Sequence, residues 1–238
     1  YASFLLGCGR LADVLGHTRI LFWGLVGSAV AFLACGLAPT FSFFLGARIL
    51  QGIGVAFILA AAPALVTLAT PPEMRGRALG VFQMGAAIGF ALGPLIGGIL
   101  VDWFGWRAVY LFRVAPAMVL ILLAMRQPRL ELKQLPLLQE FDIVGTFTLA
   151  GSVTGFLLAL NRSRELGWSS PVVLALLIGA VGCFASFLAT ERRVSAPIID
   201  LSFFRRPAFV VANLLNLMAN CAMFAIWLLV PYYIVNLP

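Results

Sequence analysis

The sequence predicts an all-α polytopic membrane protein, a bundle of helices that crosses a lipid bilayer several times. Hydrophobic residues make up 62% of its 238 residues and charged residues only 11%, against roughly 45–50% and about 25% in soluble domains. The apolar residues are gathered into runs that supply the roughly 20 residues a spanning helix needs. A soluble fold of this length could not bury so much apolar surface, so lipid must solvate much of it.

Seven complete apolar runs and the end of an earlier one follow each other along the chain. The earlier helix ends near residue 9, and we expect the complete spans at 20–38, 42–69, 78–101, 107–125, 143–160, 171–190 and 208–230. Polar or proline-containing breaks separate the runs, and Pro63 should kink the helix that contains it. Because the chain starts inside one apolar run and stops just after another, we interpret it as a fragment that lacks both ends.

Basic residues are concentrated in alternate breaks. Eleven of the 16 fall in the breaks around 10–19, 71–77, 126–142 and 191–206, whereas the other breaks have three, namely Arg107, Arg162 and Arg164. The positive-inside rule places the first set of breaks in the cytoplasm. This distribution accounts for the net charge of +7 without a nucleic-acid partner, because no basic stripe interleaved with aromatic residues accompanies it.

Cysteine and histidine usage argues against a metal or catalytic centre. Cys8, Cys35, Cys183 and Cys221 are scattered through apolar segments, and none forms a CxxC pair, so we interpret them as small buried hydrophobes. His17 is the only histidine and cannot build a metal site alone. We therefore expect neither a cofactor nor an enzyme.

The first candidate motif is the run Gly9–Arg19 in the first break. Gly9 and Gly16, seven residues apart, would let two helices approach and turn tightly. Asp13 would accept hydrogen bonds from helix-start amides and pair with an arginine. An ordinary charged loop is the alternative for this segment taken alone.

The second candidate motif surrounds an arginine inside a span. Arg48 lies about two turns into the run 42–69 and is followed by Gln51 and Gly52. An arginine within a spanning helix costs roughly 2.5–3.5 kcal/mol to insert, so it is a functional candidate by default. The alternative is snorkelling, because Arg48 is only about 9 Å along a helix from Ser42 and its long side chain could reach the interface.

The third candidate motif is a glycine face with a proline. Gly85, Gly89, Gly93 and Gly97 recur at every fourth position, which places them on one side of a helix, and Pro94 and Gly98 lie among them. Such a groove allows close contact with a neighbouring helix, and the proline removes one backbone hydrogen bond. The face could be a static packing interface or a bending, sliding hinge between helices that move.

Together, in this order and at these helices, the three motifs resemble signatures of the major facilitator superfamily. The loop signature matches at Gly9, Leu11, Ala12, Asp13, Gly16 and Leu21, and departs at Val14, His17 and Thr18. The fourth-helix signature matches at Arg48, Gln51, Gly52, Gly54 and Ala56. The fifth-helix signature matches at Gly89, Gly93, Pro94, Gly97 and Gly98. The first visible helix is then the family's second.

The resemblance implies a role for each motif. Gly9, Asp13, Gly16 and Arg19 would form a cytoplasmic gating loop. Arg48, Gln51 and Gly52 would take part in proton coupling and transport. Gly85, Gly89, Gly93, Pro94, Gly97 and Gly98 would form the helix associated with antiporters.

Further stretches resemble the 14-helix drug:proton antiporter branch of that family. Trp106-Arg107 followed by Arg113 and Pro116 is similar to the segment leading into the sixth helix, with Arg113 in place of an asparagine. The stretches 141–145, 167–171 and 197–209 are similar to the two extra central helices and the segment after them. The implied organisation is an N-terminal bundle at 1–125 without its first helix, a cytoplasmic linker at 126–142, two extra helices at 143–190 and the start of a C-terminal bundle at 191–238.

Other polar residues inside the spans are candidates for lining a cavity. Asn213, Asn216 and Asn220 share one helix face, which should look at a wet cavity or, alternatively, bond to other helices. Arg113 is a cavity charge or an interfacial snorkeller. No paired carboxylates occur inside these spans, so the titratable acid of a proton-driven pump is expected in segments outside the chain.

The predicted function is proton-coupled export of small amphipathic compounds by alternating access. The expected partners are a lipid bilayer, protons and such compounds, and the expected location is the plasma membrane, as a multi-pass protein of the bacterial inner membrane. The alternative is transport of a defined solute such as an amino acid, sugar or siderophore. A membrane enzyme would need clustered His, Asp or Glu, and a receptor or channel is disfavoured by the glycine–proline helix, which suits motion.

Overall fold

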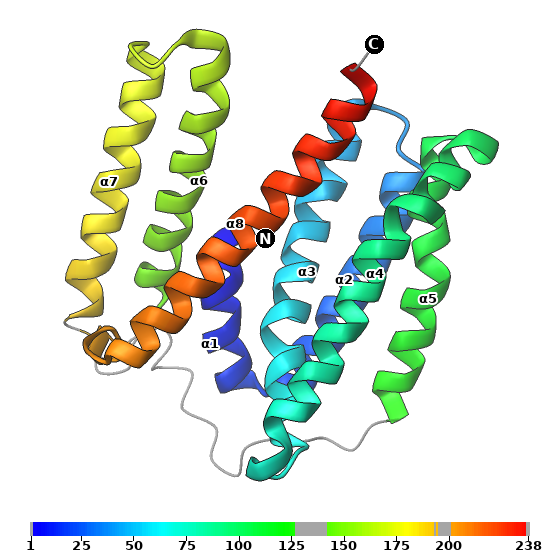
Figure 1. Cartoon of the computed structure of the whole chain (residues 1–238), viewed down its shortest axis with the longest axis horizontal. Coiled ribbons are helices and arrows are strands. Elements are labelled where there is room, and N and C mark those ends of the chain that lie inside the picture. The colour runs from blue at the N-terminus through cyan, green and yellow to red at the C-terminus, as the bar shows by residue number, and fades with distance from the viewer. Residues whose placement is uncertain (1, 127–141, 193, 195–200, 237–238) are drawn as a thin grey trace. The chain divides into compact units, whose positions relative to one another are not determined.

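The described part of the chain is mostly helical, in a computed structural model that describes residues 2–126, 142–192, 194 and 201–236 (Figure 1). These described residues contain no β-strand. The helices are α1 (Leu5–Leu15), α2 (His17–Gly36), α3 (Phe41–Leu68), α4 (Arg75–Phe104), α5 (Trp106–Arg126), α6 (Ile143–Leu166), α7 (Pro171–Glu191) and α8 (Pro207–Asn236). Single 3-10 turns, η1 (Ala2–Phe4), η2 (Pro72–Met74) and η4 (Leu201–Arg205), precede α1, α4 and α8.

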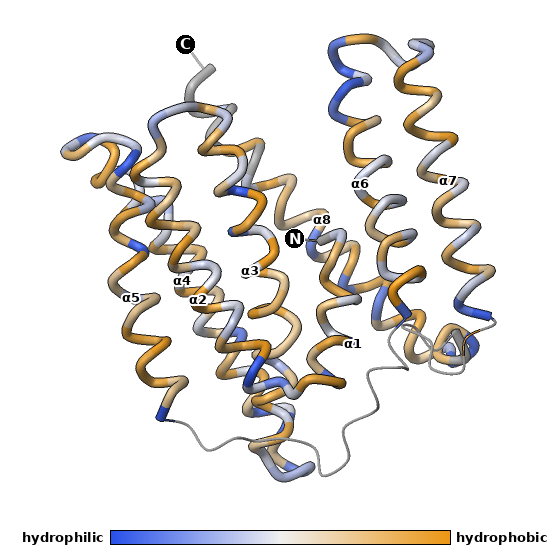
Figure 2. The backbone as a smooth tube through the Cα atoms, turned by 180° about the vertical axis from the view of Figure 1, so that it is seen from behind, coloured by the Kyte–Doolittle hydropathy of each residue, from blue (hydrophilic) through white to orange (hydrophobic). Residues whose placement is uncertain are grey.

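Seven of the described helices, all except the eleven-residue α1, are long and apolar enough to cross a membrane. They coincide with the seven predicted spans, and the predicted fold class is confirmed. Figure 2 shows hydrophobic residues along most of each helix and hydrophilic residues mainly near the ends and connections. Large side chains such as Trp103, Phe41 and Ile178 are more than 70% exposed, as expected for surfaces that lipid covers.

The chain divides into two compact units, Tyr1–Ile198 and Ile199–Pro238. The second contains η4 and α8. The predicted linker 126–142 lies outside the described residues except for its two ends, and so do the basic residues Arg129, Lys133 and Arg193 and the stretch 195–200. The domain boundaries expected from the sequence remain predictions.

Two predicted breaks are shorter than expected, because charged side chains do not prevent a helix from continuing. The expected break at 10–19 is a single corner at Gly16, since α1 runs to Leu15 and α2 begins at His17. The break expected from Asn161 begins only at Gly167, because α6 continues through a turn in which Arg162 pairs with Glu165 at 3.0 Å. Gly16 and Gly167 have φ angles of 94° and 78°, which glycine adopts without steric cost.

Helix α2 is the centre of the first unit, because it packs against both α3 and α5. One small core joins Leu25 and Ala29 of α2 to Ala117 and Ile121 of α5. A second core joins Ala12 of α1, Ile20 of α2 and Ala61 of α3. Alanine is frequent in both cores, as expected where helices associate closely within a membrane.

Helices α2 and α3 approach each other closely at a pair of glycines. A Cβ atom built on Gly54 would lie 2.9 Å from the Ser28 backbone nitrogen and 3.0 Å from the Gly24 carbonyl oxygen. A Cβ atom built on Gly24 would lie 2.9 Å from the Gly54 carbonyl oxygen. Backbone atoms cannot move aside like the end of a flexible side chain, so these two positions require glycine.

We expect Gly54→Ala to separate α2 from α3 and to destabilise the protein by about 1–3 kcal/mol, the usual cost of overpacking. The measurement is the melting temperature of the purified complete protein in detergent. Gly27→Ala is the matched control on α2, because a Cβ atom at Gly27 meets nothing within 4 Å. Equal melting temperatures for the Gly54 and Gly27 variants would contradict the expected close contact.

Candidate functional site

The candidate site begins with a polar pair inside α3. The Arg48 guanidinium donates through Nη1 to Oε1 of Gln51, 2.5 Å away, and lies 6.0 Å from the centre of the Tyr110 ring of α5. Gln51 is three residues further from the start of α3 at Phe41, and its side chain is buried while Arg48 is exposed. The guanidinium is therefore held by a side chain that lies about one turn further along its own helix.

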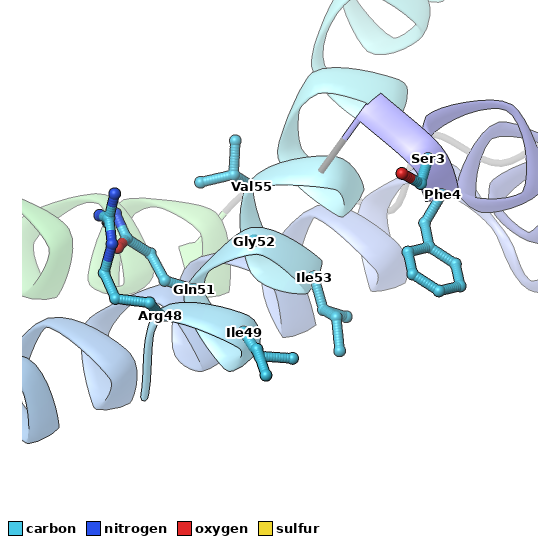
Figure 3. A pocket seen from close by; sticks show the side chains of 8 residues that line it. All are labelled: Ser3, Phe4, Arg48, Ile49, Gln51, Gly52, Ile53 and Val55. Atoms are coloured by element: carbon cyan, nitrogen blue, oxygen red, sulfur yellow. Dashed lines mark hydrogen bonds between the residues drawn. The ribbon is translucent and has the colours of Figure 1, made fainter. Parts of the chain in front are cut away.

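This pair lies at one end of an open cavity of about 570 Å³. Figure 3 shows the Arg48 guanidinium beside the Gln51 amide, whereas Ile53 and Phe4 lie toward the η1 side. The remaining described lining residues are Ser3, Ile49, Gly52 and Val55. The cavity is thus charged at one end and mostly apolar at the other. Its size falls within the usual range of roughly 300–1,000 Å³ for small-molecule sites.

The apolar end of the cavity is supported by α6. Thr154 of α6 donates a hydrogen bond to the Ser3 hydroxyl at 3.0 Å, and the Phe4 and Phe147 rings meet edge to face with centres 6.5 Å apart. The helix is held in turn against α7 at Gly155, where an added Cβ would lie 3.3 Å from the Ala180 Cβ. Helix α6 therefore contacts a segment that lines the cavity.

The predicted gating segment differs in form from the expected loop. Gly16 makes the turn, but Gly9 lies inside α1, and a Cβ there would meet nothing within 4 Å. Asp13 lies near the end of α1 and not at a helix start, and its Oδ1 is 3.4 Å from Nε2 of His17. His17, which replaces a basic residue of the signature, is buried. The segment is thus a helical corner with an Asp13–His17 contact.

The opposite end of the bundle is tied together by Arg107. Its Nη2 donates to the Ala38 carbonyl oxygen at 2.9 Å, just beyond α2, and its guanidinium lies 4.7 Å from the Trp106 ring centre. The ring of Phe44 meets those of Trp106 and Tyr110 edge to face, with centres 5.6 and 5.5 Å apart. Aromatic residues are typical of membrane interfaces, and this cluster brings Tyr110 close to Arg48.

The glycine face of α4 is open within the described chain. Built Cβ atoms meet nothing within 4 Å at any of its members, Gly85, Gly89, Gly93, Gly97 and Gly98. No residue of α4 is buried by the described residues, although the helix touches both α3 and α5. The expectation that these positions point into a neighbouring helix is therefore not met within the described part of the chain. The helix itself continues through Pro94.

The other polar candidates make contacts of their own, Arg113 within the first unit and the asparagines within α8. Arg113 of α5 lies over the Phe32 ring of α2, 5.7 Å from its centre. On α8, the Asn213 amide donates to the Phe209 carbonyl and the Asn220 amide donates to the Asn216 carbonyl, both at 2.8 Å. The side-chain N–H groups of Asn213 and Asn220 are thus partly satisfied by carbonyl groups of their own helix. All three asparagines are exposed.

Sequence reasoning missed three contributors to this region. Tyr110, Ser3 and Phe4 are far from Arg48 in sequence, and no local pattern indicated that they would lie near it. The Gly24–Gly54 contact did leave a signal, because Gly24 and Ser28 form a small-xxx-small pattern. Among the described residues, no group of three or more metal-ligating side chains occurs.

Helices long enough to span a membrane, with an open cavity and a part-buried polar pair among them, are the architecture of a polytopic membrane protein. The sequence profile of the Major Facilitator Superfamily matches residues 1–237, and the chain belongs to that family. It is 32% identical to the multidrug resistance protein Stp of Mycobacterium tuberculosis over 89% of this chain and 39% of that protein.

Two Streptomyces proteins are similar over an even larger part of the chain. The methylenomycin A resistance protein of Streptomyces coelicolor is 30% identical over 94% of this chain and 47% of its own length. The tetracenomycin C resistance and export protein of Streptomyces glaucescens is 29% identical over 99% of this chain and 44% of its own length. The chain therefore spans less than half the length of each of these three relatives.

Proposed function

We propose that the complete protein exports small amphipathic compounds from a bacterial cell in exchange for protons, by alternating access. The observation that carries this proposal is the open cavity with a guanidinium at one end and apolar walls at the other. Such a cavity suits compounds with one polar group and a hydrophobic body. The names of the three relatives, two of which include resistance to a particular antibiotic, support export as the direction.

In the same proposal, each motif has one task. Arg48, Gln51 and Gly52 couple proton movement to transport from within the cavity. The helical corner at Gly16, with Asp13 and Arg19, gates the cytoplasmic side. The complete protein belongs to the 14-helix branch. The open glycine face of α4 is the surface on which α4 bends and slides against another of its helices.

Export is tested with the full-length protein in a bacterial host that lacks its own efflux pumps. Expression should raise resistance to several structurally unrelated amphipathic antibiotics, and a protonophore should abolish their energy-dependent efflux. Unchanged resistance, together with protein-dependent movement of a single amino acid, sugar or siderophore, would instead support transport of a defined solute.

Orientation gives a separate test, because the positive-inside rule assigns a side to each connection. We expect single cysteines at Thr40 and at Gly167, where the break predicted from Asn161 begins, to react with a membrane-impermeant maleimide added to intact cells that express a protein without native cysteines. Cysteines at Glu73, Lys133 and Arg193 should react only after the membrane is permeabilised. Labelling of the Lys133 position in intact cells would reverse the proposed orientation.

A further inference from the structure

The charges within the described spans are of one sign. Away from the helix ends, the charged side chains are Arg48 of α3 and Arg113 of α5. The six described carboxylates lie at or near helix ends or between helices, at Asp13, Glu73, Asp102, Asp142, Glu165 and Glu191. This part of the protein therefore presents fixed positive charge and no carboxylate at membrane depth.

The Arg48 charge is not neutralised within the described residues. Its polar partner is the neutral Gln51 amide, which accepts one of the five N–H donors of a guanidinium. None of the described carboxylates lies within ion-pairing distance of Arg48. The contact with the Tyr110 ring is weaker than an ion pair and leaves the net charge in place. Several donors therefore remain available in the cavity.

The apolar end of the cavity indicates the chemistry of the part of a ligand that lies away from Arg48. Phe4, Ile49 and Ile53 line it and are 36%, 63% and 38% exposed, so they offer open hydrophobic surface. Ser3 adds a hydroxyl that already accepts a hydrogen bond from Thr154. A ligand that satisfies both ends would carry a negative group at Arg48 and a hydrocarbon or aromatic body toward Phe4.

We propose that this cavity selects amphipathic anions, in which a carboxylate or phenolate oxygen binds the Arg48 guanidinium. An unpaired charge is costly at membrane depth, and an anionic ligand offsets that cost with short, charge-assisted hydrogen bonds. The planar fork of arginine matches the two oxygens of a carboxylate. This inference rests on the proposed export function, since it names the substrate class of the same cavity.

The test uses three isosteric probes that differ in charge, namely naphthoate, naphthamide and naphthamidine, which are anionic, neutral and cationic at neutral pH. Their binding to the purified full-length protein in nanodiscs of zwitterionic lipid is measured by equilibrium dialysis, with empty nanodiscs subtracted. Naphthoate should bind about tenfold more tightly than naphthamide, because hydrogen bonds to a charged group contribute more than neutral ones. Naphthamidine should bind most weakly. Equal affinity for naphthoate and naphthamide, or a preference for naphthamidine, would overturn the proposal.

Variants test whether the preference for naphthoate over naphthamide depends on Arg48. Arg48→Gln should bind naphthoate no better than naphthamide, and its melting temperature in the nanodiscs should match that of the wild-type protein, which shows that it is folded. Arg48→Lys should keep a reduced preference for the anion. Arg162→Gln, which removes one positive charge at the exposed end of α6, should keep the full preference. A naphthoate preference that persists in Arg48→Gln would overturn the role of this guanidinium.

Binding is measured because Arg48 is also proposed to couple protons. A transport assay would not separate a loss of proton coupling from a loss of anion binding. If the anion preference is found but no compound is exported from cells, the proposed export function fails and the ligand class stands. If antibiotics are exported but naphthoate has no advantage, the ligand class fails and export stands.

Discussion

Replacing Arg48 by lysine in the complete protein should reduce proton-driven transport by about tenfold or more, or roughly 1.4 kcal/mol or more in the barrier, without preventing insertion. The guanidinium holds Gln51 through Nη1 while its plane lies near the Tyr110 ring. A lysine ammonium is a point charge that cannot keep both contacts in the same geometry. Arg48→Ala should lose transport more completely. The measurement is proton-dependent substrate uptake into inverted membrane vesicles, divided by the amount of protein in the membrane.

A matched change separates the charge from its neighbour. Gln51→Leu keeps the arginine but removes the acceptor, so it should reduce transport less than Arg48→Ala does. Normal transport by Arg48→Lys would show that a positive charge alone is sufficient, and snorkelling would then explain this residue better than coupling.

The existence of the spans could be predicted from the sequence because lipid imposes a simple rule. A backbone in hydrocarbon must satisfy its own hydrogen bonds, so a long apolar run becomes a helix wherever its tertiary neighbours lie. The predicted span 107–125 matches α5 at Trp106–Arg126 within one residue at each end. Prolines did not mislead this prediction, since α3 and α4 continue through Pro63 and Pro94.

Helix ends were harder to predict, because hydropathy records where lipid ends and not where helical hydrogen bonding ends. Thus α6 reaches Leu166, six residues beyond the expected end, and Arg162 and Glu165 stabilise the extension. At the first corner the glycine was a better indicator of the helix end than hydropathy, since α1 ends where Gly16 adopts a positive φ.

The candidate site could be predicted in part. Arg48 and Gln51 are three residues apart on one helix, so their contact follows from helical geometry. The approach of Tyr110 and Phe4 depends on how three separate segments pack, and no local pattern contains that information. The glycine face of α4 was predicted from the spacing of its glycines, whereas the sequence does not identify a neighbour for it, and a Cβ atom built at these positions meets nothing within 4 Å.

That open face leads to the second large expected effect. In the complete protein, Gly93→Leu should leave membrane abundance unchanged and reduce transport per molecule by about tenfold, or roughly 1.4 kcal/mol in the barrier. A Cβ at Gly93 meets nothing within 4 Å here, so the position does not take part in the close packing of α4 on α3 or α5. The bulk of the leucine would act instead on the helix that uses the groove during transport.

Pro94→Ala should act in the same direction for a different reason. Alanine restores the backbone N–H that proline lacks, and this N–H can bond the Phe90 carbonyl and stiffen α4. Gly80→Leu is the control, because Gly80 is equally open and lies thirteen residues from Gly93, on a different helix face. Substrate binding and counterflow are measured on all three variants at equal abundance. A Gly93→Leu protein that binds substrate but does not exchange it is trapped in one state, as expected for a moving helix. Lower abundance with normal activity per molecule would instead identify the face as a static packing interface.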